Sequence, residues 1–304
     1  MDRLSAMALL VKVTELGSMS AAARALNTPL TTISRNIAEL ESTLGVRLLL
    51  RTTRKLTLTD AGVGYVAAAR RILEEVEQAE SQALGEYQQP KGELTIAAPT
   101  MFGRRHVLPV VTEFLARYPQ IRARLLLSDR NADLLDEHID LAVRIGTLPD
   151  SGMVAIRLGE MRIVTCAHPA LLEKHGLPQR PRELSALPTI RIESPMPYRG
   201  WRFNATMAED RLVEPQPVLC VTTPESAADA ARLGVGVARL LHYQAIDGLA
   251  CGELKLMLEA TEPEPAPVHL LYTARDLAPL KLRKFLEFAT PMLRQALARV
   301  ATAR

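Results

Sequence analysis

Residues 19–40 read MSAAARALNTPLTTISRNIAEL, and this stretch decides the fold of the N-terminal part of the chain. Ser20 is a suitable N-cap for a first, alanine-rich helix, whose small side chains let a second helix approach closely. Asn27 and Pro29 then break that helix, because asparagine tolerates turn conformations and proline disfavours a helical residue before it. Proline also suits the first turn of a new helix. The sequence therefore predicts two short helices joined by a tight turn.

The second helix is predicted to have one apolar face and one small polar face. Apolar residues at spacings of four, three and four predict a buried stripe of Ile33, Ile37, Leu40 and Leu44. The other face carries an arginine among hydroxyl groups: Thr31, Thr32, Ser34 and Arg35. Arginine can form a bidentate pair with guanine, and hydroxyl groups contact phosphates or base edges. We expect this face to enter the major groove of double-stranded DNA; the alternative is an ordinary solvated helix face.

A basic β-ribbon is predicted directly after this helix. Gly45 is a helix stop, and the residues up to Gly62 read as two short strands. The tip between them contains Arg51, Thr52, Thr53, Arg54 and Lys55. Such a tip can reach phosphates or a narrow minor groove, which attracts arginine.

These segments resemble the winged helix-turn-helix of LysR-type transcriptional regulators. The resemblance rests on residues 18–26, 34–37, 40–41, 44–48 and 58–62, and it extends through residues 93–290. It implies that the DNA contacts come from Thr31, Thr32, Ser34, Arg35, Arg51, Thr53 and Arg54. The sequence departs from the family pattern at two places: Leu30 stands where many members have a glutamine facing the DNA, and Leu49-Leu50 replaces a commoner aromatic and acidic pair.

The composition is that of a globular protein of two or three folding units. The 304 residues are 48% hydrophobic and 23% charged, with a net charge of +3. Up to Asp60 there are eight basic and five acidic side chains, so the remainder is about neutral and suits a small-molecule module. Three cysteines without close spacing predict neither a disulfide framework nor a metal site. With neither a secretory leader nor a membrane span in view, we expect a cytoplasmic protein.

Two further helices flank this module. Residues 2–16 predict an amphipathic core helix with Leu4, Met7, Ala8 and Val11 on its apolar face. Thr59 is a fair N-cap for a long helix that ends near Gln88. That helix carries a heptad seam of Val66, Ala69, Leu73, Val76, Glu80, Ala83 and Tyr87, which is apolar except for its interruption at Glu80. We expect a homodimer that presents two helices to a roughly palindromic site; the alternative is a helix folded back on its own chain.

A cluster of helix-breaking residues at 88–92 marks a domain boundary, and the sequence beyond it has a different periodicity. Short apolar runs there alternate with helical stretches, which favours an α/β domain with a parallel sheet. The expected elements include a short helix near residues 131–136, a strand at 235–238, a return strand at 268–272 and a final helix from 280 to about 298. We expect domains at 1–59 (winged helix-turn-helix), 60–90 (linker and dimerisation helix) and 91–304 (effector binding). The resemblance implies two lobes similar to type 2 periplasmic binding proteins, with lobe I at about 91–162 and 267–304 and lobe II at about 163–266.

The resemblance also implies a small-molecule effector between the lobes. The residues expected to contact it are Thr100, Met101, Ser128, Arg144, Trp201, Thr223 and Glu225. A helix N-terminus at residues 224–226 suits a carboxylate-bearing effector. Alternatives stay open: Thr100 and Ser226 are also plausible N-caps, Arg144 a structural ion-pair residue, and Trp201 a core residue or an oligomer contact.

Apparent enzyme motifs do not hold up. Gly234-Val235-Gly236 precedes a predicted strand instead of following one, and the histidines show no metal-ligand spacing. The acidic pair Glu209-Asp210 is most simply solvated surface. We therefore expect no catalytic residue, metal or cofactor. We expect a sequence-specific DNA-binding transcriptional regulator, and the resemblance implies that it acts as a dimer of dimers. The alternative is a solute-binding or enzymatic α/β domain with an N-terminal helical dimerisation module. An RNA-binding winged helix is disfavoured by the lack of an aromatic platform.

Overall fold

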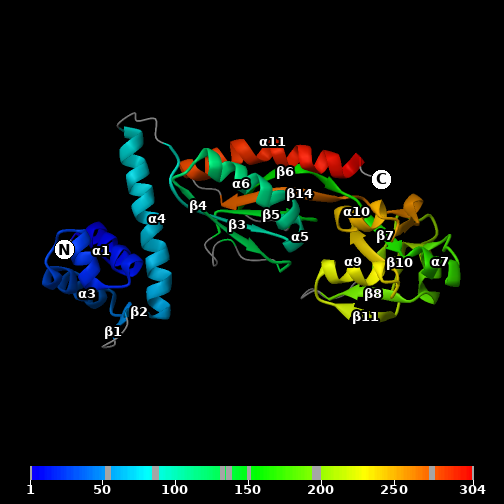
Figure 1. Ribbon diagram of the computed structural model, residues 1–304, viewed down its shortest axis with the longest axis horizontal. Helices are drawn as coiled ribbons and strands as arrows, with labels where there is room; N and C mark the ends of the chain where they lie inside the picture. Colours follow the sequence, from blue (N-terminus) through cyan, green and yellow to red (C-terminus); the bar gives the residue numbers. More distant parts are fainter. Residues whose placement is uncertain are drawn as a thin grey trace. The chain divides into compact units, whose positions relative to one another are not determined.

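The computed structural model describes residues 2–51, 56–83, 89–130, 134, 139–148, 152–193, 200–273 and 278–302. The chain divides into two compact units, Met1–Gln89 and Pro90–Arg304 (Figure 1). The tip of the predicted wing, the end of the long helix and most of a short helix predicted at residues 131–136 lie outside the described residues.

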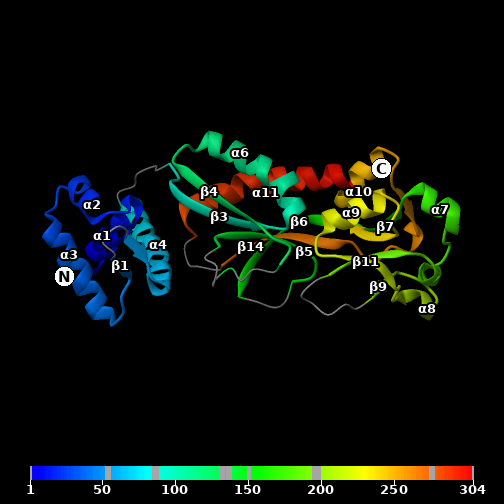
Figure 2. The same cartoon turned by 60° about the horizontal axis from the view of Figure 1, so that its bottom comes forward.

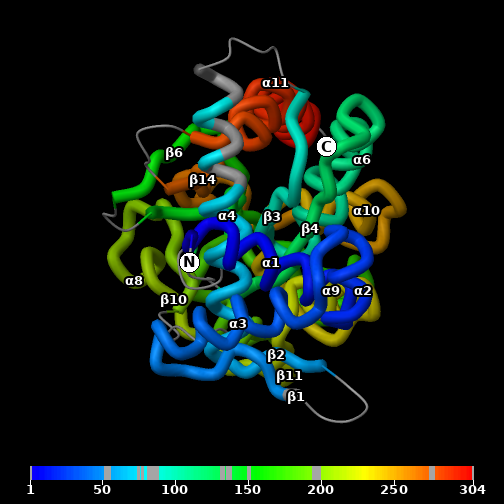
Figure 3. Tube along the Cα trace, turned by 90° about the vertical axis from the view of Figure 1, so that its left-hand side faces the viewer, coloured from blue at the N-terminus to red at the C-terminus, as the bar shows by residue number. Residues whose placement is uncertain are grey.

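The N-terminal unit contains the predicted helices and the β-ribbon. Helices α1 (Arg3–Leu16), α2 (Met19–Ala25) and α3 (Leu30–Leu44) are followed by β1 (Leu49–Arg51), β2 (Leu56–Leu58) and α4 (Asp60–Ala83) (Figure 3). Strands β1 and β2 pair antiparallel, with Leu49 opposite Leu58. The predicted N-cap of α2 was wrong: Ser18, and not Ser20, accepts the hydrogen bond, from the Ala21 N–H. Gly45 ends α3 in the left-handed conformation, as predicted.

The core of this unit corrects two predicted apolar faces. Its buried side chains are Ala6, Leu10, Val13, Ala22, Ile33, Ile37, Leu40, Leu48, Leu49 and Val66. On α1 the buried face contains Leu10 and Val13, whereas the predicted Leu4 and Ala8 are exposed. Apolar residues occupy so many positions of α1 that spacing alone does not select one face. Leu44, predicted on the α3 stripe, is also exposed.

Helix α4 begins as predicted and then lies along its own chain. The Thr59 hydroxyl accepts a hydrogen bond from the Gly62 N–H at 2.9 Å and so caps the helix. Val66 and Ala69, the first residues of the predicted seam, are buried, and α4 packs on α1. This part of the seam therefore follows the alternative in which the helix packs on its own chain.

Lobe I is built on a five-stranded sheet in the order β4-β3-β5-β14-β6. The strands are β3 (Gly92–Ala98), β4 (Ile121–Leu127), β5 (Leu141–Ile145), β6 (Met153–Met161) and β14 (Ala266–Thr273). Strand β3 is parallel to β4 and β5, as the alternating pattern predicted, whereas the return strand β14 is antiparallel to β5 and β6. The antiparallel pairing arises because β14 returns to this sheet from the other lobe.

One face of this sheet is covered by two helical segments. Helices α5 (Thr100–Phe102), η1 (Gly103–Val107) and α6 (Leu108–Arg117) follow one another directly and lie beside α11 (Leu280–Thr302) (Figures 1 and 2). Phe102, Phe114 and Phe285 are fully buried between the helices and the sheet. The other face buries Ala97, Leu134, Ile139, Ala142 and Leu271.

Lobe II consists of small sheets surrounded by short helices. The sheets are β12-β7-β13, β11-β8 and β10-β9. The elements are β7 (Ile163–Ala167), α7 (Pro169–His175), η2 (Pro181–Ala186), β8 (Thr189–Ile192), β9 (Trp201–Arg202), α8 (Ala208–Arg211), β10 (Leu212–Val213), β11 (Pro217–Val221), α9 (Pro224–Arg232), β12 (Ala238–Leu241), α10 (His242–Ala250), β13 (Lys255–Met257) and η3 (Glu259–Thr261). Alanines of α9 pack on β7 and β12.

The strand predicted at residues 235–238 is displaced to β12. Gly234 adopts a positive φ of 78° just after α9, and a Cβ on Gly236 would lie 2.8 Å from the Pro188 carbonyl oxygen. Gly234 therefore allows a turn, and Gly236 allows two backbone segments to approach closely. Together they delay the start of the strand.

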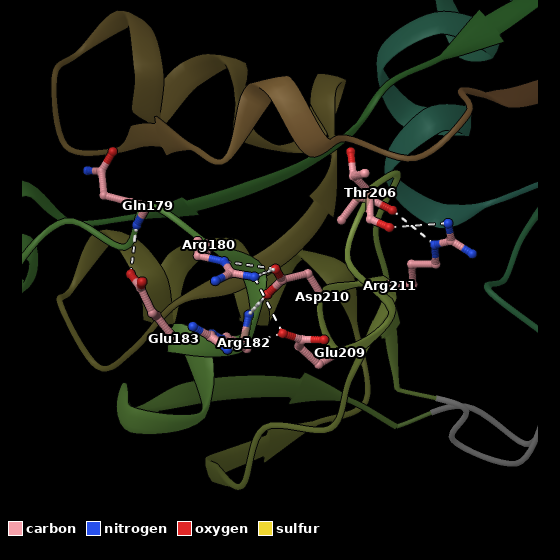
Figure 4. A network of polar contacts seen from close by, with 9 residues as sticks. Gln179, Arg180, Arg182, Glu183, Thr206, Glu209, Asp210 and Arg211 are labelled. Carbon is pink, nitrogen blue, oxygen red and sulfur yellow. Dashed lines mark hydrogen bonds and ion pairs between the residues drawn. The ribbon is translucent and has the colours of Figure 1, made fainter.

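Asp210 does not lie on the solvated surface that the sequence predicted. Its side chain is nearly fully buried and accepts hydrogen bonds from Arg180 Nε at 2.9 Å, Arg180 Nη2 at 2.6 Å and the Arg182 N–H at 3.1 Å (Figure 4). Glu209 contacts Arg180 and Arg182 from the exposed side. This network joins η2 to α8 within lobe II.

Candidate DNA interface and effector site

Helix α3 presents the face that the sequence predicted for DNA contact. Ile33 and Ile37 are fully buried, which turns the side chains of Thr31 and Arg35 to solvent. Thr32 and Ser34 are half-buried at the edges of this face. The turn before α3 places Asn27 at a positive φ of 48°, a conformation that asparagine tolerates.

Leu30, at the first turn of α3, is an exposed apolar residue. Its exposed fraction is 45%, although it neighbours the polar face of Thr31 and Ser34. An apolar side chain there cannot reproduce a hydrogen bond from glutamine, but it can contact the methyl group of thymine. Leu50 is also exposed, whereas Leu49 is buried in the core of the N-terminal unit.

Glu41 links α3 to the wing, a role that the sequence reasoning missed. Its Oε1 accepts hydrogen bonds from the Leu48 N–H at 2.7 Å and the Leu49 N–H at 2.9 Å. Leu48 lies directly before strand β1 and Leu49 begins it, so the carboxylate fixes the direction in which the ribbon leaves the helix. Arg51 lies in β1 without a described side chain, and Thr53 and Arg54 lie outside the described residues.

Tyr243 lies in α10, a helix that contributes side chains to the cores of both lobes. Burial raises the pKa of Tyr243, and the negative charges of Asp129 and Glu225 raise it further. Asp129 follows β4 of lobe I, while Glu225 lies in the first turn of α9 in lobe II. Segments from both lobes therefore act on the same hydroxyl group.

On the lobe I side, the predicted residues form a hydrogen-bonded corner. The Thr100 N–H donates to Asp129 Oδ1 at 3.1 Å, and the Ser128 N–H donates to the Ala98 carbonyl oxygen at 3.0 Å. Ser128 is exposed, whereas Met101 is buried and offers little surface. The N-cap position of α5 is Pro99, so Thr100 is not a side-chain cap. Arg144 lies in β5, half-buried.

On the lobe II side, the α9 N-terminus is largely occupied by its own residues. The Thr223 hydroxyl accepts from the Ser226 N–H at 3.2 Å, and Pro224 brings no N–H. Thr223, and not Ser226, is therefore the N-cap. Oε2 of Glu225 is buried and has no hydrogen-bond partner in the described part of the chain. Trp201 packs in a hydrophobic cluster with Leu171 and Phe203, which matches the core role left open for it.

Titratable groups near this junction are held neutral by burial. Burial lowers the pKa of His106 and of His242, and neighbouring arginines lower it further. Burial raises the pKa of Cys166 to about 12, so this thiol stays protonated at neutral pH. Among the described residues no group of histidine, cysteine and acidic side chains is arranged to hold a metal ion.

Two family models match the chain. Residues 4–63 match "Bacterial regulatory helix-turn-helix protein, lysR family", and residues 87–294 match "LysR substrate binding domain". The chain belongs to the LysR family of transcriptional regulators. LysR-type regulators bind DNA and small-molecule effectors and form oligomers, and they are regulators and not enzymes.

Relatives match this LysR-type regulator over nearly its whole length. An HTH-type transcriptional regulator of Xanthomonas campestris is 35% identical, over 97% of this chain and 89% of the relative. The HTH-type transcriptional activator AaeR of Escherichia coli is 31% identical, over 93% of this chain and 91% of the relative. The structure of CrgA, a LysR-type regulator of Neisseria meningitidis, is similar with a TM-score of 0.61 at 31% identity, covering 95% of this chain and 98% of CrgA.

The match to full-length LysR-type structures confirms the predicted architecture of a helix-turn-helix followed by an effector-binding α/β domain. None of the described helices is by itself both long and apolar enough to cross a membrane; the pair α1 and α2 meets the requirement only jointly, with a bend of 114° between them.

Proposed function

We propose that this LysR-type regulator reads its operator with the exposed face of α3 and holds the DNA backbone with the wing. The base-reading residues are Thr31, Thr32, Ser34 and Arg35, and the wing residues are Arg51, Thr53 and Arg54. The observation that carries the proposal is the exposure of Thr31 and Arg35 opposite the buried Ile33 and Ile37. Leu30 adds an apolar contact to a thymine methyl group at the end of the same surface.

A mobility-shift titration at two salt concentrations, with unrelated competitor DNA, tests this division of labour. Arg35→Ala should lose about 1–3 kcal/mol of discrimination between operator and competitor, because it removes a base contact. Arg54→Ala should weaken binding to all sequences alike and flatten the salt dependence. Lys12→Ala is the matched control, since Lys12 lies on α1 and already pairs with Glu15 at 3.3 Å. Equal behaviour of the Arg35 and Arg54 variants would contradict the assignment.

We further propose that the effector binds between the lobes beside Tyr243. Its expected contacts from lobe I are Thr100, Met101, Ser128 and Arg144. From lobe II they are Thr223 and Glu225, which Trp201 is expected to support from the hydrophobic core. The combined influence of Asp129 and Glu225 on Tyr243 supports this location. An effector carboxylate finds only the Glu225 N–H left uncapped in the first turn of α9. The unpartnered Oε2 of Glu225 favours an effector that also carries a hydrogen-bond donor.

A steric block tests the effector site. Ser128→Trp adds bulk to an exposed position of the proposed cleft, and Ser185→Trp adds it to an exposed position of η2 as a control. A screen of small carboxylic acids first finds a compound that alters the mobility of the wild-type complex with DNA. Ser128→Trp should abolish that response and keep operator binding, while Ser185→Trp should keep both. A response that survives Ser128→Trp would place the effector elsewhere.

The finer organisation of the molecule is also a proposal. Residues 1–59 form the DNA-binding domain, 60–90 the linker and dimerisation helix, and 91–304 the effector domain. Homodimers associate as a dimer of dimers on promoter DNA in the cytoplasm. Effector binding shifts the relative disposition of the subunits and so changes DNA bending, without any chemical step.

A further inference from the structure

A cavity of about 420 Å³ lies between η1, α6, α10 and α11, and Tyr243 is not among the residues that line it. Its deepest lining residues are Val110 and Val300, both nearly fully buried. Ile246 and Met292 add partly buried apolar walls. An apolar cavity of about 150 Å³ already holds a benzene molecule, and ligand pockets start near 300 Å³. This space is therefore large enough for a small ligand with an apolar body.

The charged residues of the cavity are distributed along its length. Phe114 of α6 contacts Phe285 at 5.0 Å between ring centroids, so the C-terminal half of α11 faces the beginning of α6 and η1. Arg299 therefore lines the same end as Arg105. Glu113 follows Arg105 by eight helical residues, or about 12 Å. The cavity thus has a basic end next to α10 and an acidic residue at its far end.

Of the described cations that line the basic end, Arg299 is the one available to an incoming anion. Arg105 donates to the Tyr243 carbonyl oxygen at 3.1 Å and forms an ion pair with Asp247. His106 stays neutral near pH 7, because burial and Arg105 lower its pKa. Arg299 is exposed on α11 and lines the cavity. A carboxylate at this end would meet Arg299 while its apolar part rests on Val110 and Val300.

Helix α10 connects this cavity to both lobes. Tyr243 of α10 is buried in the lobe I core, with its ring edge on Phe102 at 5.6 Å. Two residues later, Ala245 belongs to the lobe II core. Ile246, which follows, forms the α10 wall of the cavity. A ligand held between Ile246 and α11 would therefore brace the element that both lobes share.

We propose that this cavity is a second effector site, separate from the cleft between the lobes. Its ligand is a small carboxylic acid with a compact apolar body, such as a single aromatic ring. Binding holds α10 against α6 and α11 and so restricts the movement of lobe II relative to lobe I. The proposal does not depend on the DNA contacts, because binding is measured on the full chain without DNA.

Calorimetric titration with phenylacetate tests the site, and uncharged phenylacetamide is the control ligand. Phenylacetate should bind the wild type with one saturable site per chain, about tenfold more tightly than phenylacetamide. Arg299→Gln should remove this preference, whereas Arg283→Gln, an exposed arginine of the same helix outside the cavity, should keep it. Ile246→Trp should abolish binding by filling the space. Phenylacetate should also slow amide hydrogen exchange within α10 in the wild type only.

Three results would overturn the proposal. The first is the absence of saturable phenylacetate binding by the folded wild type. The second is binding that survives Arg299→Gln and Ile246→Trp but is lost in Ser128→Trp, which would assign the ligand to the cleft between the lobes. The third is a change of oligomeric state in Ile246→Trp by sedimentation, which would assign the cavity to a contact between subunits.

Discussion

At the scale of the residue, the role of Glu41 depends on which backbone N–H groups the fold brings to its carboxylate, and not on the residue type alone. In the sequence it is one of several charges on α3, and the family resemblance covers it without indicating a partner. In the structure its carboxylate accepts from the Leu48 N–H, directly before β1, and from the Leu49 N–H, the first of β1. The carboxylate thus pairs two partly buried backbone donors where the ribbon begins.

Glu41→Ala should therefore lower the free energy of unfolding of the N-terminal unit by about 2 kcal/mol, because it leaves two partly buried donors unsatisfied. Glu41→Gln keeps an acceptor oxygen and should lose less than half of that. Glu39→Ala, an exposed position of the same helix, should stay within about 0.5 kcal/mol of the wild type. Urea unfolding followed by circular dichroism measures all three. Equal losses for the Ala and Gln variants of Glu41 would show that the hydrogen bonds do not matter.

The residues of the two candidate sites differ in how well the sequence predicts them. Thr31 and Arg35 were predicted as exposed because the helical period places them on the face opposite Ile33 and Ile37. The cleft residues share no period, since Thr100, Ser128 and Glu225 come from the ends of separate elements and meet only after the sheets form. Their predicted contacts with an effector stay predictions. The roles of Asp210 and Arg105 depend on partners 30 and 142 residues away, and the role of Glu41 depends on two N–H groups beyond the end of its helix; spacing reveals none of these.

At the scale of the element, two glycines of α4 have opposite requirements. A Cβ on Gly62 would lie 2.0 Å from the Leu48 carbonyl oxygen, so only glycine lets the helix approach the strand. A Cβ on Gly64 would meet nothing within 4 Å. Gly62→Ala should lower the free energy of unfolding by about 2 kcal/mol or more, because backbone must move. Gly64→Ala should raise it by about 0.5–1 kcal/mol through helix propensity.

Thermal and urea unfolding of the two glycine variants check this contrast in one experiment. The pair is well matched, since both changes add one methyl group to the same turn of α4. A stabilising Gly62→Ala, or two variants of equal stability, would mean that α4 does not approach the Leu48 backbone as described.

The Asp210 network gives lobe II a pH-dependent stability. Burial alone would raise the pKa of Asp210, but the hydrogen bonds from Arg180 and the Arg182 N–H, with the charges of both arginines, outweigh burial and lower the pKa. A carboxyl whose pKa is lower in the folded state stabilises the protein above its unfolded pKa, about 4, and this contribution is lost as pH falls through the folded value.

Asp210→Asn should therefore destabilise the chain near neutral pH, and the difference from the wild type should shrink as the pH falls below about 4. Urea midpoints measured between about pH 6 and pH 3 give this difference directly. Glu209→Gln, an exposed neighbour, should show a much weaker effect. A difference that is independent of pH would mean that the Asp210 charge does not contribute.

Long elements with a clear period were predicted well, and short or edge elements were not. Helices α3, α4 and α11 followed from their apolar spacing. Strand β6 was missed because it lies at the edge of its sheet and carries Arg157, Gly159 and Glu160, which obscure an apolar pattern. Helix α10 was missed because its nine residues mix polar and apolar types on a helix buried from two sides.

At the scale of the whole molecule, the first part of the long helix α4 packs within its own N-terminal unit. Val66 and Ala69 are already buried against their own chain, so they are not free to pair with a second copy. The homodimer that the heptad seam predicts must then use the part of α4 beyond them. Ile72 is 38% exposed there, although it is a large apolar residue. Exposed apolar side chains of this kind favour a contact with another subunit.

Ile72→Asp should therefore convert the dimer to monomer, because it places a charge in an apolar contact. Val63→Asp is the matched control: Val63 is 57% exposed, and nine residues, or about 180° of helical rotation, put it on the opposite side of α4. Sedimentation equilibrium of both variants decides between pairing through this face and pairing through the effector domains alone. If Ile72→Asp alone loses the dimer, this variant should also lose tight operator binding. Each half-site then binds the α3 of one chain without the α3 of a second chain on the other half-site. A dimer that persists in Ile72→Asp would remove α4 from the interface and leave subunit pairing to the α/β domain.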